Sequence, residues 1–347
     1  MTDYNFRYIL EKGSKKYHCP ECTKRRFVLY IDTETGEYLP DHYGRCDRES
    51  KCSYQLNPYK DGYIKMLWEE EQGNETNWKP QQRRRTRNVP KPVIEFIPFD
   101  VLKQSRGGYE SNVFIQNLLS RVPFPFKVQD IEKMISQYHL GTVQNGYRKG
   151  ANTFPFIDID NMVRAIQVKQ FDKTNHTTGT DFLHSIIEKH HTRNNKPLPE
   201  WLQAYNKNDT KVSCLFGEHL LSKYPYNPIA LVEAPKTAIY GTLYFGFPEE
   251  PTNLLWLAVY NLSSLNLNKC KALKGRNVYL FPDLSKGGTA FELWSKKAGQ
   301  IQSQLKGTQF TVSNLLERSA SSQDKEKGKD IADYLISQDW RLFRKQE

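Results

Sequence analysis

The sequence predicts an α/β protein in which a small zinc-held module precedes a core that contains a parallel sheet. Two observations lead to this fold class. Four of the six cysteines lie in the first 52 residues, and short apolar runs alternate with helical stretches between residues 229 and 312. The 347 residues are enough for two or three domains.

The N-terminal cysteines form two close pairs: Cys19 with Cys22, and Cys46 with Cys52. Thiolates at such spacings close a tetrahedral shell around one Zn²⁺, and four protein ligands make the site structural rather than catalytic. Four unrelated buried thiols are the competing interpretation. Three neighbouring side chains are alternative ligands: His18, His42 and Asp47.

The module is expected to span residues 1–68 and to be a zinc ribbon. Residues 26–32 alternate as a strand does, residues 33–37 have the composition of a hairpin turn, and residues 38–39 begin a return strand. Short hairpins of this kind place the ligand pairs of zinc ribbons. Cys214 and Cys270 lie alone in apolar stretches, which is typical of core residues.

Residues 69–93 have the composition of a linker. An acidic run is followed by six Lys or Arg residues between positions 79 and 91. This tether could contact phosphates or act as a solvated spacer. The whole chain carries a formal net charge of +11, which favours a polyanionic partner, most simply nucleic acid.

Residues 94–208 are predicted to form the first part of the core, with mixed secondary structure. Apolar spacing predicts helices over 109–119 and 128–138, and alternation predicts paired strands over 154–160 and 163–171. Alternation in the second strand puts Arg164, Gln167 or Lys169 on a solvent face. Residues 173–199 are polar, with two short helical signals, and the pair at 190–191 is expected to be a solvated helix end.

Residues 209–347 have the clearest α/β rhythm and are predicted to form the second part of the core. Short apolar runs that alternate with helices are typical of a parallel sheet covered on both faces. The predicted strands are 229–233, 254–259, 277–283 and 309–312, and the predicted helices are 237–244 and 289–304.

Two acidic residues follow predicted strands in this part of the chain, Glu233 and Asp283. Ligands of open parallel sheets bind beyond the carboxyl ends of the strands, where carboxylates can hold Mg²⁺. Lys236 follows at the start of a helix, a position suited to an anion. The interpretation that involves no chemistry is that both acids cap helix N-termini. Walker and dinucleotide-binding glycine motifs are absent.

The order of these features resembles the Toprim-containing DNA primases of bacteria and phages, and most closely the primase-like proteins of bacterial mobile elements. The resemblance rests on the cysteine module and basic tether, followed by Phe-Pro-Phe-Ile-Asp at 154–158, Leu-Phe-Gly at 215–217, Val-Glu at 232–233 and Phe-Pro-Asp at 281–283. It implies a primase-like core with a Toprim-type parallel α/β domain. In that family a Glu serves as general acid or base and an Asp-x-Asp pair holds Mg²⁺.

The resemblance gives Glu233 the glutamate role and Asp283 that of the first aspartate. Residues 328–335 resemble a Lys-Asp-x-x-Asp-Tyr-Leu segment of related domains, so Asp330 and Asp333 could contribute charge to cofactor binding. The motif is degenerate elsewhere. Ser285 replaces the second Asp, Ala234 replaces the Gly after the glutamate, and residues 259–261 replace a glycine turn.

These features support two principal functions. The first is a primase-like protein that acts mainly by binding single-stranded or forked DNA, or a replication, transfer or defence protein. The alternative is an active Mg²⁺-dependent primase that makes short primers on single-stranded DNA. A Toprim-type nuclease or topoisomerase is a minor third interpretation. The chain has no 18-residue apolar run and no signal peptide, so we expect a cytoplasmic location and no membrane partner.

Overall fold

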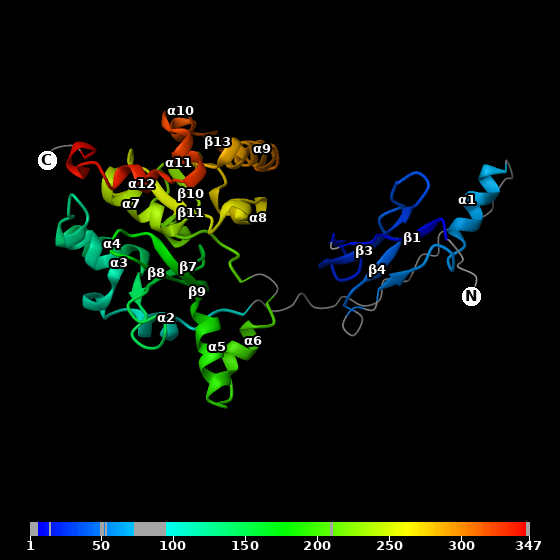
Figure 1. The fold of residues 1–347 in the computed structure, drawn as a ribbon, viewed down its shortest axis with the longest axis horizontal. Coiled ribbons are helices and arrows are strands. Elements are labelled where there is room, and N and C mark those ends of the chain that lie inside the picture. The colour runs from blue at the N-terminus through cyan, green and yellow to red at the C-terminus, as the bar shows by residue number, and fades with distance from the viewer. Residues whose placement is uncertain are drawn as a thin grey trace. The chain divides into compact units, whose positions relative to one another are not determined.

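The protein is described by a computed structural model that covers residues 6–13, 15–48, 52, 54–72, 95–208 and 211–344. The chain divides into two compact units, Met1–Pro90 and Lys91–Glu347 (Figure 1). Most of the predicted basic linker lies outside the described residues. Of the helices in the described ranges, none has the length and apolar character needed to cross a membrane.

The first unit is an antiparallel five-stranded sheet followed by one helix. Its elements are β1 (Tyr8–Leu10), β2 (Tyr17–His18), β3 (Arg25–Asp32), β4 (Gly44–Cys46), β5 (Gln55–Leu56) and α1 (Tyr63–Glu71). The predicted strand at 26–32 is confirmed as β3. Phe27 and Leu29 pack against the buried cysteines, whereas Tyr30 packs with Tyr8 and Tyr43. Alternation along β3 therefore supplies a core to each face of the sheet.

The second unit begins with helices that precede an antiparallel four-stranded sheet in the order β6-β7-β8-β9. The elements are α2 (Phe99–Ser105), α3 (Val113–Gln116), α4 (Val128–Tyr138), β6 (Gly141–Thr142), β7 (Asn152–Ile157), β8 (Val163–Phe171), β9 (Thr177–Phe182), α5 (Leu183–Arg193) and α6 (Glu200–Tyr205). The helix predicted at 128–138 and the strand predicted at 163–171 are confirmed.

One prediction in this region was wrong in detail, and one strand was not predicted. The single helix expected at 109–119 is instead a 3₁₀ turn, the short helix α3 and a π-helical turn. Asn112 explains the break, because its side chain caps α3 and also donates hydrogen bonds to Gly141 and Asn152. Strand β9 was missed, since its polar sequence is held to β8 by backbone pairing rather than by an apolar face.

The remainder of the second unit is built on a parallel four-stranded sheet in the order β11-β10-β12-β13. Its elements are β10 (Ile229–Val232), α7 (Pro235–Phe245), β11 (Leu255–Ala258), α8 (Leu267–Cys270), β12 (Asn277–Phe281), α9 (Thr289–Gln304), β13 (Gln309–Val312), α10 (Leu315–Ser319), α11 (Ser322–Lys327) and α12 (Ile331–Leu335). All four strands were predicted, and the two long helices α7 and α9 were predicted with them.

The antiparallel and parallel sheets share one hydrophobic core. Phe154 and Phe156 of β7 contact the ring of Phe216, whose backbone bridges to Ala258 at the end of β11. Tyr138 at the end of α4 donates a hydrogen bond of 2.9 Å to the Trp256 carbonyl. These contacts fix the antiparallel sheet beside the carboxyl ends of the parallel strands, where the predicted acids lie.

Candidate functional sites: a cysteine cluster and an acid centre

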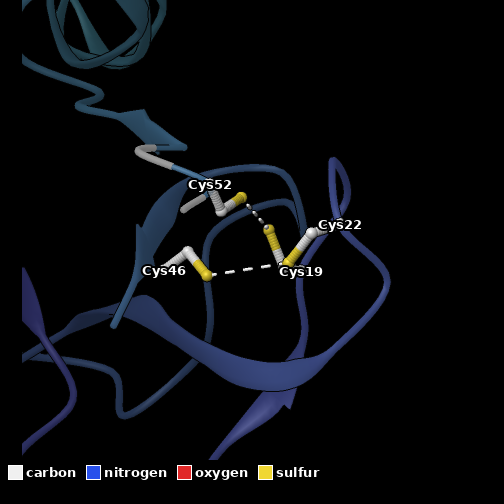
Figure 2. Close-up of side chains that lie close together, drawn as sticks. All are labelled: Cys19, Cys22, Cys46 and Cys52. Carbon is white, nitrogen blue, oxygen red and sulfur yellow. Dashed lines mark hydrogen bonds between the residues drawn. The ribbon is translucent and has the colours of Figure 1, made fainter. Parts of the chain in front are cut away.

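The four N-terminal cysteines converge on one point, and we call them the zinc cluster (Figure 2). Their sulfur atoms all lie within 4.8 Å of one another. The Cys19 and Cys52 sulfurs are 3.7 Å apart, and those of Cys22 and Cys46 are 3.8 Å apart. A tetrahedron with Zn–S bonds of about 2.3 Å has edges of roughly 3.8 Å. The spacing therefore fits one Zn²⁺, and the four sulfurs leave no open position for a substrate.

Local backbone geometry positions the cysteines of the zinc cluster. Thr23 adopts a positive φ of 58° directly after the first pair, and the N–H of Cys19 donates to the Lys24 carbonyl at 2.9 Å. The second pair is held by the N–H of Cys46, which donates to the Tyr54 carbonyl at 2.9 Å. The three alternative ligands lie outside the cluster. His18, for example, is hydrogen-bonded through Nδ1 to the Thr23 carbonyl.

The second cluster, which we call the acid centre, consists of Glu233, Asp283, Asp330 and Asp333. Glu233 follows β10 and Asp283 follows β12, and these strands are direct neighbours with Val232 opposite Phe281. Both acids therefore leave the sheet at the same edge, as the alternation of strands and helices predicted.

The C-terminal acids reach this edge through backbone pairing. The N–H of Leu284, one residue beyond Asp283, donates to the Lys329 carbonyl at 2.9 Å. This contact brings the start of α12 to the end of β12. Asp330 is 6% exposed, and its Oδ2 accepts a hydrogen bond of 2.7 Å from the Thr237 hydroxyl of α7. Figure 1 shows α12 beside α7.

Lys236, in the first turn of α7, pairs with the two C-terminal acids. Its Nζ lies 3.4 Å from Oδ2 of Asp330 and 3.4 Å from Oδ1 of Asp333. Burial alone would favour the neutral amine, but the two carboxylates outweigh it and raise the pKa of Lys236. Lys236 is therefore a buried, charged partner of the C-terminal acids. The anion-binding role expected for it from the sequence stays a prediction.

The charged forms of the two strand-end carboxyls, Glu233 and Asp283, are unfavourable in the folded protein. Burial raises the pKa of Asp283 well above its usual value, and the charges of Asp330 and Glu233 raise it further. Burial also raises the pKa of Glu233, which Lys169 partly offsets. Acids in this state are stabilised by any nearby cation.

Lys169 was not predicted to belong to this site. Alternation along β8 had placed it on a solvent face, but it is half-buried and Gln167 is fully buried. Burial and Lys236 lower the pKa of Lys169, while Asp330, Glu233 and Asp283 raise it. The charge of Lys169 therefore acts on the acid centre from the antiparallel sheet. Strand β8 also contains Arg164, Gln167 and Gln170, so its sequence did not single out Lys169.

The three positions at which the sequence resemblance predicted departures from the Toprim pattern lie in distinct structural environments. Ser285 accepts a hydrogen bond of 2.8 Å from the N–H of Ala290, so its hydroxyl is engaged at the start of α9. Ala234 is the N-cap of α7. Tyr260, in the expected glycine turn, has a φ of 110°, a conformation that costs of order 1–3 kcal/mol for a non-glycine residue. Its N–H donates to the Glu233 carbonyl at 2.9 Å.

The acid centre is therefore a group of four carboxylates with two lysines among them. Within the described ranges, the zinc cluster is the only group of three or more His, Cys, Asp or Glu side chains whose ligand atoms lie within 4.8 Å of one another. Glu233, Asp283 and Asp330 are neighbours, but no three carboxylates of the centre meet at that distance.

Comparisons with known proteins agree with the division into two units. Residues 6–66 match a family of zinc beta-ribbon fingers, and residues 112–284 match a family described as a domain of unknown function (DUF6371). No curated protein matches the chain.

Solved primase structures show a weak overall likeness. The primase fragment of the bacteriophage T7 primase-helicase has a TM-score of 0.33 and 12% identity, with 86% of this chain and 89% of that chain covered. The zinc-binding and RNA polymerase domains of the Aquifex aeolicus primase have a TM-score of 0.38 and 11% identity, with 94% and 80% covered. These values do not transfer an activity. The comparisons thus connect the first unit to zinc ribbons and the second to a domain family without an assigned function.

Proposed function

We propose that this chain is a nucleic-acid-binding, primase-like protein whose acid centre serves recognition and structure rather than primer synthesis. One observation carries the proposal. Two of the four carboxylates of the acid centre, those of Asp330 and Asp333, are paired with Lys236, and no three of the four come within 4.8 Å of one another among the described residues. Mg²⁺ at phosphoryl-transfer sites is held by one or two carboxylates together with substrate phosphates, and the pairing with Lys236 already engages two of the four carboxylates here.

Binding of nucleic acid is supported by charge and by the surface of the first unit. The net charge of +11 favours a polyanion. On the ribbon, the ammonium of Lys15 lies 5.1 Å from the Tyr17 ring centroid and 5.2 Å from that of Tyr38. Tyr38 is 41% exposed. An exposed ring beside a lysine suits base stacking together with phosphate contact on a single strand.

The finer assignments follow from the sequence resemblance. Within this proposal the preferred ligand is single-stranded or forked DNA, and a replication, transfer or defence protein of a mobile element is the protein partner that we would test. We also propose that residues 94–208 and 209–347 are the N-terminal and Toprim-like parts of the core, joined to residues 1–68 by the linker.

The second candidate function is an active Mg²⁺-dependent primase with Glu233 and Asp283 as its catalytic acids. One observation favours it. The raised pKa values of these two carboxyls reflect burial and mutual repulsion, which a divalent cation would relieve. In this case Glu233 would move a proton during nucleotidyl transfer, and Asp283 would be a ligand of the ion.

Primer synthesis and strand binding, measured on the same samples, distinguish the two functions. Wild type and Glu233→Ala are incubated with single-stranded DNA, labelled ribonucleotides and Mg²⁺ or Mn²⁺. Binding is followed by fluorescence anisotropy from low to high salt. We expect no primer from either protein and binding that weakens steeply with salt. Primers that disappear in Glu233→Ala would establish the enzyme. Salt-insensitive or absent binding would contradict the proposed function.

A further inference from the structure

The oxygen atoms of Asp330 and Asp333 are divided between two tasks. Oδ1 of Asp330 accepts the N–H of Asp333 at 3.0 Å, and Oδ2 of Asp333 accepts the N–H of Asp330 at 3.0 Å. This reciprocal capping box begins α12. The remaining oxygens, Oδ2 of Asp330 and Oδ1 of Asp333, are the two atoms that face the ammonium of Lys236. Every carboxylate oxygen of the pair is therefore engaged.

The ammonium has the position that a bridging cation would have. It is equidistant, at 3.4 Å, from Oδ2 of Asp330 and Oδ1 of Asp333, and the Lys236 side chain is only 12% exposed. Thr237, the next residue of α7, adds a hydroxyl that donates to the same Oδ2 of Asp330. A divalent ion would need these same oxygens, because Mg²⁺ and similar ions bind carboxylate oxygens directly.

We propose that Lys236 is a built-in counter-ion that excludes divalent cations from Asp330 and Asp333, and that removing its charge opens a cation site there. The inference deepens the proposed function, on which it rests for the role of the acid centre. Lys236 is thus a specificity-determining residue. It replaces an exchangeable ion with a permanent charge and holds the start of α12 against α7.

A charge-deletion series in the zinc-loaded full chain tests this inference. Mn²⁺ binding is measured by the loss of the electron paramagnetic resonance signal of the free ion, for wild type and Lys236→Met. Lys327→Met is the matched control, because this exposed lysine lines the same cavity of about 500 Å³. Among the described residues, Lys327 has no ion-pair partner. We expect one more Mn²⁺ per chain in Lys236→Met than in wild type or the control.

The added site must depend on the freed carboxylates. The double variant Lys236→Met with Asp333→Asn is expected to lose it, and Mn²⁺ is expected to raise the melting temperature of Lys236→Met but not that of wild type. Lys236→Gln gives the same readouts if the methionine variant does not fold. An unchanged number of Mn²⁺ in a folded variant, or an added site that persists in the double variant, would overturn the inference. Strand binding is measured separately, so failure here leaves the proposed function standing.

Discussion

The zinc cluster and the acid centre differ in where their compensating charge comes from. In the zinc cluster, four sulfurs stand at the edge lengths of a metal tetrahedron. In the acid centre, four carboxylates share the edge of a sheet with the ammonium groups of Lys236 and Lys169. Under the proposed function, a group of ligand-type residues is not by itself a metal site. The basic residues around it decide whether an external cation is needed.

The largest expected effect is the loss of a zinc ligand. Cys46→Ser removes one of four sulfurs, and structural Zn²⁺ contributes on the order of 10 kcal/mol to the folding of small metal modules. We expect the first unit to lose its zinc and its fold, while residues 91–347 stay folded because they have their own core. Zinc content and limited proteolysis measure both effects.

His18→Ser is the control for this experiment, since His18 lies outside the cluster. It should retain zinc in full. A Cys46→Ser protein that unfolds throughout would contradict the division into two units, and a variant that keeps its zinc would remove the contrast between the two clusters.

The next largest effect concerns the internal counter-ion. Lys236→Met leaves two acids without their partner, and removing one member of a buried ion pair costs about 3 kcal/mol. The side chains of Lys236 and Asp330 are 12% and 8% exposed, so the pair is close to that buried limit. Chemical denaturation should show this loss, against a change within about 0.5 kcal/mol for the exposed Lys327→Met. Equal stability of the two variants would show that the ion pair contributes little.

Asp283→Asn tests whether the charged form of Asp283 is unfavourable in the folded protein. Its expected effect on stability is smaller than that of Lys236→Met and of opposite sign. Because the folded pKa of Asp283 is raised, its contribution to stability is complete below its unfolded pKa, near 4, and is lost as the pH rises through the folded pKa. We therefore expect the variant to be more stable than wild type at pH 8, by up to about 2 kcal/mol. The gain should vanish at pH 4.

Melting curves at both pH values test this expectation, with the exposed Asp160→Asn as the control. A gain of equal size at pH 4 and pH 8 would mean that packing, rather than charge, is responsible. A loss of stability at pH 8 would show that the Asp283 carboxylate is well compensated by the chain's own lysines.

Local patterns explain what could be predicted from the sequence. The two close cysteine pairs predicted the zinc cluster, and the four strands of the parallel sheet were visible as short apolar runs such as Ile229–Val232. Glu233 and Asp283 were placed at the same sheet edge because parallel strands share a direction.

Tertiary contacts explain what was not predicted. Strand β9 has a polar sequence, so only its pairing with β8 reveals it. The pairing of Lys236 with Asp330 and Asp333 joins residues 94 and 97 positions apart, through the contact between Leu284 and Lys329. Lys169 acts from a different sheet. No periodicity in the chain encodes these charge pairings.

The smallest expected effects are those of substitutions at Ser285, which test whether the acid centre lacks only one carboxylate. Ser285 accepts the N–H of Ala290 at 2.8 Å, so Ser285→Ala should lower the free energy of unfolding by about 1 kcal/mol, as is usual for a lost helix-start acceptor.

Ser285→Asp restores an Asp-x-Asp sequence and retains an acceptor, so we expect little change in stability. We also expect no added Mn²⁺, because the new carboxylate would be held at the start of α9 and Lys236 would still occupy Asp330 and Asp333. Mn²⁺ binding and chemical denaturation, measured for both variants, test these two expectations. An Asp variant that gains a Mn²⁺ site would mean that a missing ligand, and not the internal lysine, separates the acid centre from a metal site.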